Sequence, residues 1–464
     1  MGNDLRLDLQ PKRTLKFWHI WALGVGAVVG DGIFLLMGQG IAVAGPSSIV
    51  SYIIAGLFQL FLILALTEMA VAMPNAGAMS MWVERFMGKS WGFLAGMTFA
   101  IGWIIAGGSV GMALGKITMW FFPSLTASWW PTFFAILFIT IFALINMAGV
   151  MFAARLQLYL VAALVGVMVI FAIIGFKDVD LNNFTPFIPY GMEGFFGAIP
   201  MGTYAYLGAL TLVTAGAEAI NPERDLPRGL IWSSITFIAI YSFAHFVLQG
   251  IIPYTDVTID SSPFTVAAGK VFGVAGAFIM NAAAWIAAAT TILMGTLYAA
   301  SRIFYEQARE GMLPKFLGKI HPKTYAPINA ILIIWAATVV LIVIGQFNPD
   351  LIYIELSNQL VIAWLFSWSL ALIASVIYRM KHKDEIAKLR WRQPLFPLFP
   401  VLGFIGIIIV LYGSFVNDLM TLVRGGIWLA ILFILFSVFN KSAFKKQQPV
   451  HAEQEIKAGE VKND

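Results

Sequence analysis

The stretch "GVGAVVGDGIF", residues 24–34, places four glycines and one acid, Asp31, inside a long apolar run. The whole run, residues 17–43, is long enough to cross a hydrocarbon core about 30 Å thick as a helix that rises about 1.5 Å per residue. Glycine at Gly30 and Gly32 lets the backbone leave the helical conformation and removes side-chain bulk. We therefore predict a membrane-spanning helix that is interrupted near its middle.

The composition of the rest of the chain is that of a membrane protein. Its 464 residues are 60% hydrophobic and 11% charged, against roughly 25% charged in soluble domains, and the mean hydropathy is +0.84. Short alternating strands, the mark of a membrane β-barrel, are absent from the sequence. We predict an all-α fold with twelve spans, at about 17–43, 47–72, 91–121, 131–149, 155–176, 194–217, 229–252, 271–304, 327–345, 351–378, 395–416 and 424–440.

The positive charges predict the orientation. If the N-terminus is cytoplasmic, all of the 29 lysines and arginines lie on the inner side except Lys116, Lys177, Lys270 and Arg424. This asymmetry follows the positive-inside rule and predicts that both termini are cytoplasmic. It also accounts for the net charge of +5 without a nucleic acid partner.

The chain divides into five segments. Residues 1–16 are polar and lack a cleavage site, so we expect a retained cytoplasmic segment and not a signal peptide. Residues 441–464 are charged and poor in apolar residues, which predicts a disordered cytoplasmic tail. Between them lie spans 1–5 (17–176), spans 6–10 (194–378) and spans 11–12 (395–440). The chain has no cysteine, which excludes disulfides and thiolate metal sites, and no pattern in it indicates an oligomeric state.

A second interruption is predicted in span 6. The run "AYLGALTLVTAGAEAINPERDLPRG", residues 205–229, carries Gly208 well inside an apolar segment. It follows the first interruption by five spans, and a unit with an odd number of spans repeats with inverted topology. Interrupted helices at corresponding positions of two halves indicate a transporter binding site. We predict a core of five plus five helices and two peripheral helices.

The interruptions suit a small ligand. Backbone groups left unpaired there must face protein or a water-filled cavity, because lipid cannot satisfy them. The segment from Ile33 onward would present N–H donors and partial positive charge, while the preceding segment would present carbonyls. For Asp31, three roles stay open: an N-cap, a counter-ion for a substrate ammonium, or a proton carrier.

Several motifs, kept in order over residues 17 to about 330, resemble those of the amino acid, polyamine and organocation transporter superfamily, in particular its bacterial amino acid permeases. Residues 24–34 are similar to the signature G-x-G-x-[IV]-[IV]-G-[ST]-G-I-F of the first helix. The other matching segments are "EMAVAMPNAGAMSMWVERFMG" (68–88), "NMAGVMFAARLQ" (146–157), "TAGAEAINPERDLPRG" (214–229) and "ASRIFYEQAREGMLPKFLGKIHPKTYAPINA" (300–330). The resemblance implies two inverted five-helix repeats, alternating access, and a substrate centre between helices 1 and 6, lined further by helices 3, 8 and 10.

The resemblance also implies which residues bind the substrate. The backbone of the first interruption would hold one end, and carbonyls of the second would receive the amino group. Aromatic side chains could close over the substrate or bind an ammonium through a ring face. The expected substrate-binding residues are Val29, Gly30, Asp31, Gly32, Ile33, Tyr206, Leu207 and Gly208 from the resemblance, together with Trp103 for its ring and Leu210, two residues after Gly208.

The chain departs from the family pattern around this centre. Asp31 stands where the family usually has Ser or Thr, and Leu210 stands where many bacterial members have an acid. The lysine that some proton-coupled relatives carry in helix 5 is missing from residues 156–171. Thr290 and Thr291 fall where sodium-coupled relatives supply hydroxyl ligands.

Two coupling ions therefore remain open, a proton or Na⁺. A sodium site would join the two threonines to carbonyls near Gly26 and Val29, with Asp31 close by. The alternative is that both hydroxyls bond their own helix backbone, as threonine in membrane helices ordinarily does. No other metal or cofactor is expected.

Other polar residues in or near the spans have structural interpretations. Glu68, Glu84, Glu218 and Asp225 lie near cytoplasmic helix ends and are expected to pair with arginines, of which the candidates are Arg85, Arg224, Arg228 and Arg302. His245 in span 7 is either a packing residue or a proton relay. Glu355 and Asn358 in span 10 are candidates for a contact at an outer gate.

These features favour a secondary active transporter of an amino acid or related organic amine in the cell membrane. An organic cation or polyamine carrier is the alternative, favoured by the extra charge of Asp31. The sequence has no carbonyl-filter motif or ring of pore acids, which disfavours an ion channel. It also lacks a zinc motif, a His/Asp cluster and a phosphate-binding loop, which disfavours an enzyme or an ATP-driven pump. The expected partners are the small-molecule substrate and the lipid bilayer.

Overall fold

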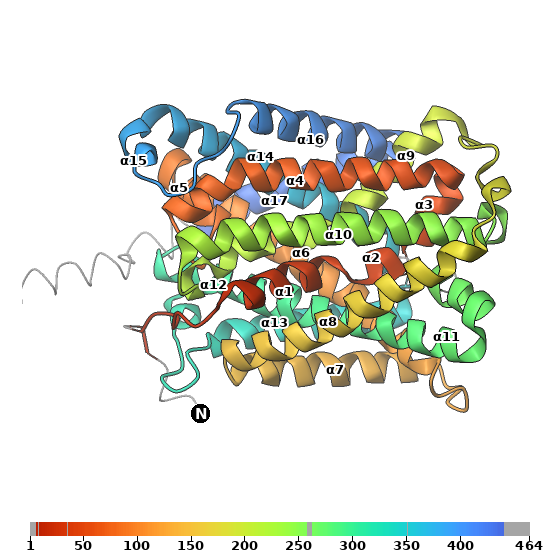
Figure 1. Ribbon diagram of the computed structural model, residues 1–464. Coiled ribbons are helices and arrows are strands. Elements are labelled where there is room, and N and C mark those ends of the chain that lie inside the picture. Colours follow the sequence, from red (N-terminus) through yellow and green to blue (C-terminus); the bar gives the residue numbers. More distant parts are fainter. Residues whose placement is uncertain (1–5, 8, 35, 258–261, 350, 440–464) are drawn as a thin grey trace, which may run out of the picture.

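The computed structural model describes residues 6–439 except positions 8, 35, 258–261 and 350, and at Asp31, Leu36, Tyr353, Ile354, Val438 and Phe439 it describes the backbone only. The predicted tail, 441–464, lies outside the described residues. The described part is a bundle of long helices (Figure 1), with no strand beyond two isolated β-bridges. The all-α fold predicted from the sequence is confirmed.

The described residues of the first part of the chain, through residue 175, form eight α-helices. They are α1 (Phe17–Val28), α2 (Asp31–Phe34), α3 (Leu36–Ala44), α4 (Ser48–Ala72), α5 (Met79–Met87), α6 (Lys89–Met119), α7 (Trp130–Met147) and α8 (Val150–Gly175). The second half contains α9 (Gly191–Ala205), the 3-10 helix η4 (Leu207–Glu218), α10 (Pro222–Ile251), α11 (Pro263–Thr291), the π-helix η6 (Ile292–Ala299), α12 (Ala300–Arg309), α13 (Ile328–Phe347), α14 (Ser357–Lys381), α15 (Lys383–Ala387), α16 (Leu398–Asn417) and α17 (Leu419–Phe439).

Eleven helical stretches of the described residues are long and apolar enough to cross a membrane. One of them, Gly32–Ala72, joins α3 and α4 across a single 3-10 turn, Gly45–Ser47, and so contains parts of two predicted spans. The apolar helix α1 is too short to span alone. The count of twelve depends on α1 and α3 forming one span, and it stays a prediction together with the inverted repeat.

Proline and glycine punctuate the helices where the chain turns. Pro131, Pro222 and Pro263 lie in the first turns of α7, α10 and α11, where a missing N–H costs no intrahelical hydrogen bond. Gly149, with a φ of +119°, separates α7 from α8, a conformation that residues with a Cβ rarely adopt. These local signals explain why the predicted spans lie close to the observed helices.

The interrupted first helix lies inside the bundle. Helix α1 packs against α8, α10 and η4, and helix α6 packs against α5, α7, α13 and α14. Helix α16 lies at the edge of the bundle in Figure 1, against α4 and α9, and α17 packs against α14 and α16 with most of its length unburied. Helices α7 and α8 keep large apolar side chains exposed, such as Phe133 and Ile173. Such outward apolar surface suits contact with lipid tails.

Two segments differ from the simplest sequence prediction. The connection at residues 73–88, which the motif placed after span 2, contains the short helix α5. Span 8 was expected to begin at 271, but α11 begins at Pro263 and is kinked at Gly273, where φ is +67°. The kink falls on a glycine because glycine alone tolerates that backbone conformation without strain. The predicted start of the span, residue 271, lies two residues before the kink.

Candidate functional site

Both predicted helix interruptions are present. Helix α1 ends at Val28, Val29 is extended with φ of −77° and ψ of 92°, and α2 begins at Asp31. Helix α9 ends at Ala205, and after Tyr206 the chain continues as the 3-10 helix η4. A 3-10 run this long is uncommon in proteins, and such runs within a helix often mark a hinge.

The glycines of the interruptions bring two backbones together. A Cβ built on Gly208 would lie 1.9 Å from the carbonyl oxygen of Ala27, and one built on Gly32 would lie 2.6 Å from the Cα of Ala205. Neither glycine, nor Gly30, has a left-handed φ. Both properties expected from the sequence are present: the backbone leaves the helical conformation at Val29, and the missing side chains let the two backbones meet, without a left-handed glycine.

Freed carbonyls at the interruptions have a side-chain partner. The Tyr241 hydroxyl of α10 donates to the carbonyl of Val28 at 2.9 Å and lies 3.4 Å from that of Ala205. One tyrosine hydroxyl thus contacts a carbonyl at each of the two interruptions, and lipid could not supply such a hydrogen-bond donor. The sequence analysis missed Tyr241, because nothing in the chain's 13 tyrosines distinguishes it.

A small central cavity of about 20 Å³ lies between the two interruptions, with room for about one water molecule. A molecule larger than water therefore needs side chains or helices to move before it fits. The cavity is lined by Ala27, Val28, Gly30, Gly32, Trp103, Ala106, Val110, Tyr204, Ala205, Leu207, Gly208, Thr291 and Trp364.

The cavity brings together half of the predicted substrate residues. Gly30, Gly32, Trp103, Leu207 and Gly208 line it, whereas Val29, Ile33, Tyr206 and Leu210 are buried outside its wall. The side chain of Asp31 lies outside the described residues, so its three possible roles stay open.

The aromatic residue of span 6 that faces the cavity is Tyr204. Tyr206, which the sequence suggested, packs instead against Gly56 of α4 and the ring of Tyr241, whose centroid is 4.9 Å away. On the facing side, Trp103 of α6 packs against Trp364 of α14 with ring centroids 4.9 Å apart. Three aromatic rings thus enclose a cavity whose other walls are mostly small residues and backbone.

The predicted sodium-site residues are partly assembled. The Thr291 hydroxyl lies 3.4 Å from the carbonyl of Gly26 and 3.1 Å from that of Ala287, while Thr290 bonds only its own helix, at 2.9 Å from Ala287 among the described residues. Val29 is buried. These contacts bring Thr291 to the first interruption, and ion coupling there stays a prediction.

Gln157 of α8 is a further polar side chain at this place. It is fully buried against Gly26, where a Cβ would come within 1.9 Å of its amide nitrogen. Neither atom of its amide has a hydrogen-bond partner among the described residues. Buried polar atoms without partners are uncommon. Among the described residues, Gln157 therefore places a free amide next to α1, and the sequence analysis did not identify this residue.

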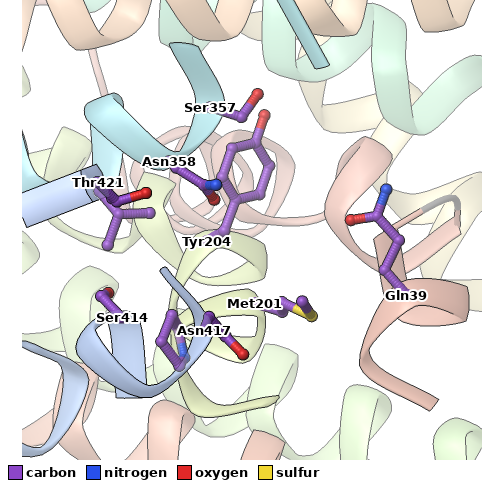
Figure 2. Close-up of a pocket in the computed structure, with 10 residues that line it drawn as sticks. Gln39, Met201, Tyr204, Ser357, Asn358, Ser414, Asn417 and Thr421 are labelled. Atoms are coloured by element: carbon purple, nitrogen blue, oxygen red, sulfur yellow. The ribbon is translucent and has the colours of Figure 1, made fainter. Parts of the chain in front are cut away.

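A larger outer cavity of about 200 Å³ lies by α3 and α9, at the end of the bundle opposite the start of α1 (Figure 1), and Figure 2 shows the residues that line it. It is lined by Gln39, Pro200, Met201, Tyr204, Ser357, Asn358, Val361, Ser414, Asn417 and Thr421. Asn358 had been expected near an outer gate with Glu355. Glu355 instead lies 3.6 Å from Arg424, in an exposed ion pair. Tyr204 lines both cavities and so stands between them.

The N-terminal end of the bundle is closed by a buried ion pair. Arg302 of α12 lies 3.1 Å from Glu218 of η4, and both side chains are only 1% exposed. The Tyr298 hydroxyl also donates to Glu218, and the guanidinium lies 3.9 Å from the Tyr298 ring centre. The expected pairing of Glu218 is confirmed, whereas Glu68 pairs with Arg379, which was not among the arginines considered.

The N-terminal segment crosses this closed end. The backbone N–H of Leu15 donates to the Glu218 carbonyl at 2.9 Å, and Arg6 exchanges two backbone hydrogen bonds with Ile320. The buried guanidinium of Arg309 donates to the carbonyls of Leu7 and Leu9, both at 2.9 Å. The segment therefore lies against helices of the second half instead of extending away from the bundle.

Glu84 of α5 lies at the same end, outside the membrane-spanning helices. Burial, and then the neighbouring carboxylates of Glu310 and Glu306, raise its pKa to about 7, against the opposing effect of Lys89. The folded protein thus binds this proton more tightly than the unfolded chain, so stability falls as the pH rises from about 4.5 to about 7.

His245 of α10 is fully buried and lies 3.2 Å from Ser48 and 2.8 Å from Gln249, which fits a packing residue.

Glu84→Gln is expected to remove this pH dependence. The variant should melt about 2 °C higher than the wild type at pH 8 and close to it at pH 5, in thermal unfolding of the detergent-solubilised protein. Glu193→Gln, at an exposed carboxylate, is the matched control and should follow the wild type. Parallel curves for Glu84→Gln and wild type from pH 5 to 8 would contradict the prediction.

Comparison with known proteins supports a single family over nearly the whole chain. A model of the family described as amino acid permease matches residues 19–442. The branched-chain amino acid permease BcaP of Lactococcus lactis subsp. cremoris (strain MG1363) is 29% identical, over 95% of this chain and 97% of that protein. In Bacillus subtilis (strain 168), the amino-acid permease RocC is 28% identical, over 92% and 93%, and a branched-chain amino acid permease BcaP is 25% identical, over 94% and 95%.

Proposed function

Because the chain belongs to the amino acid permease family, we propose that it carries a neutral amino acid with an apolar side chain across the membrane by alternating access. It is an amino acid transporter, a multi-pass membrane protein and not an enzyme. What is proposed is the substrate class, the site and the coupling. The observation that carries the proposal is the cavity between the two helix interruptions.

The wall of this cavity supports a neutral substrate. Among the residues whose side chains the structure describes, none that lines the cavity is charged. The freed backbone of the two interruptions can bind the ammonium and carboxylate that all amino acids share. Ala106, Val110 and the rings of Trp103 and Trp364 leave an apolar surface for the side chain. Two of the relatives carry branched-chain amino acid permease as their name, which makes L-leucine the first substrate to test.

The two ends of the bundle support alternating access. The N-terminal end is closed by the Glu218–Arg302 pair and the N-terminal segment, while the opposite end is hollowed by the outer cavity. Release on the closed side requires these contacts to separate. From the distribution of lysine and arginine we place this closed end in the cytoplasm and the protein in the cell membrane.

Transport driven by a proton or sodium gradient completes the proposal. Thr291 beside the Gly26 carbonyl is the candidate sodium contact, and Asp31 is the candidate proton carrier or counter-ion. Uptake of L-leucine by protein reconstituted in liposomes tests the function. Saturable uptake that other neutral amino acids inhibit supports it, and a preference for polyamines or organic cations would favour the alternative carrier. A non-saturating conductance would favour a channel.

Asp31→Asn is expected to uncouple or weaken transport. An acid at membrane depth is costly, and where one is present it usually has a function. If Asp31 carries the coupling proton, the variant should lose proton-driven accumulation and keep leucine exchange. If it is a counter-ion, KM should rise by about tenfold, the loss of roughly 1.4 kcal/mol. Asp31→Ser is the second variant. Wild-type behaviour of both at every pH would leave Asp31 as a helix cap only.

A further inference from the structure

The outer cavity is formed by helices of the predicted core and by both peripheral helices. Gln39 comes from α3, Tyr204 from α9 and Asn358 from α14, while Ser414 comes from α16 and Thr421 from α17. Figure 2 shows Gln39 across the cavity from Asn358 and Ser414. At about 200 Å³ it is much larger than the central cavity of about 20 Å³.

The chemistry of the wall is polar and uncharged. Seven of the ten lining residues carry an amide or a hydroxyl: Gln39, Tyr204, Ser357, Asn358, Ser414, Asn417 and Thr421. Amides and hydroxyls both donate and accept hydrogen bonds, so one such wall can bind an ammonium and a carboxylate together. The other three residues, Pro200, Met201 and Val361, supply an apolar surface.

Hydrogen bonds hold the walls together. The Asn417 amide donates to the carbonyl of Gly197 at 2.7 Å, which joins α16 to α9, and the Gln359 amide donates to the carbonyl of Thr421 at 3.2 Å, which joins α14 to α17. The Thr421 hydroxyl is engaged by Asp418 at 3.0 Å. The peripheral helices are therefore bonded to the helices that also line the central cavity.

The two cavities are neighbours along the same helices. Tyr204 belongs to both walls, and on α14 Val361 lines the outer cavity while Trp364, about one turn further, lines the central one. A molecule in the outer cavity is thus separated from the central cavity by the Tyr204 side chain.

We propose that the outer cavity is a second amino acid site, which binds a zwitterion with an uncharged side chain before it passes Tyr204. This rests on the proposed function, and it adds a site to which the two peripheral helices contribute directly. The lining residues that the structure describes carry no charge, so they offer no counter-charge to a cationic substrate, and the cavity selects neutral amino acids ahead of the central cavity.

The chain has no native cysteine, so single cysteines can report occupancy. Asn358→Cys would be labelled with a membrane-impermeant methanethiosulfonate, with and without L-leucine. At a leucine concentration about ten times its dissociation constant, labelling should slow about tenfold, because about one site in eleven is then free. Lys270→Cys, exposed and outside the cavity, should not be protected.

A second background separates the outer site from the central one. Ala106→Phe and Val110→Phe each place a large ring in the central cavity only, and gel filtration checks that they fold. Leucine should still protect Asn358→Cys in these backgrounds, and Ser414→Phe, which fills the outer cavity, should abolish the protection. The proposal is overturned if leucine no longer protects Asn358→Cys in the Ala106→Phe and Val110→Phe variants, or if it still protects in Ser414→Phe. It is also overturned if putrescine protects as well as leucine does. If Ala106→Phe transports leucine normally, the proposed central site fails instead, and the labelling result stands by itself.

Discussion

Replacing Gly208 with alanine is expected to abolish leucine uptake. The added Cβ would lie 1.9 Å from the Ala27 carbonyl oxygen and 2.3 Å from its carbon, both backbone atoms of α1. Overpacking typically costs about 1–3 kcal/mol when side chains can adjust, and here two interrupted backbones must separate instead. The helices that form the central cavity can then no longer meet.

The chain offers a graded series around this substitution. At Gly30 the nearest atom to an added Cβ is the Thr291 hydroxyl, at 2.4 Å, and a hydroxyl can rotate, so Gly30→Ala should reduce uptake only in part. Gly166→Ala, at a helical position with nothing within 4 Å, is the matched control and should transport normally. Uptake in liposomes and thermal unfolding of each variant measure the series. Normal uptake by Gly208→Ala would show that the two interruptions do not need this contact.

Removing the Glu218 carboxylate is expected to destabilise the protein strongly. Arg302 would remain with its charge buried at 1% exposure, and breaking such a pair on one side typically costs about 3–5 kcal/mol. Tyr298 would also lose the acceptor of its hydroxyl. Glu218→Leu should therefore lower the melting temperature in detergent and the yield of folded protein.

A double variant and an exposed pair give the controls. Adding Arg302→Met to Glu218→Leu removes the orphaned charge and should recover much of the stability, because apolar replacements of a buried pair are often neutral. Glu355→Gln breaks the half-exposed pair with Arg424 and should change stability by less than about 1 kcal/mol. The interpretation fails if the double variant is no more stable than Glu218→Leu.

The spans and their interruptions could be predicted because their signals are local. A run of apolar residues must form a helix in lipid to satisfy its own backbone, and Gly30, Gly32 and Gly208 mark where that helix stops. Trp103, expected as an aromatic residue over the substrate, and Thr291, expected at a sodium site near the first interruption, both line the central cavity. Helix α5 was missed because residues 73–88 lie between two predicted spans and were given no helix of their own.

The faces of the helices could not be predicted in the same way. In a helix that is apolar on all sides, no stripe of polar residues shows which side faces a cavity. The sequence analysis named Tyr206 and did not consider Tyr204, which lies two positions away and therefore about half a helical turn around the helix. Gln157 and Tyr241 are buried polar residues whose partners depend on helices far away in the chain.

The sequence by itself determined the membrane-embedded all-α class, the predicted orientation and the places where two helices break. The fold class, the predicted orientation and the helix breaks depend on composition and on residues that are neighbours in the sequence. These properties are the same whatever conformation the chain adopts. Only the tertiary structure decided that Tyr204 separates two cavities, that Glu68 pairs with Arg379, and that α16 and α17 help to line the outer cavity. Those facts depend on the distance and rotation between helices, which are set when all of them pack at once.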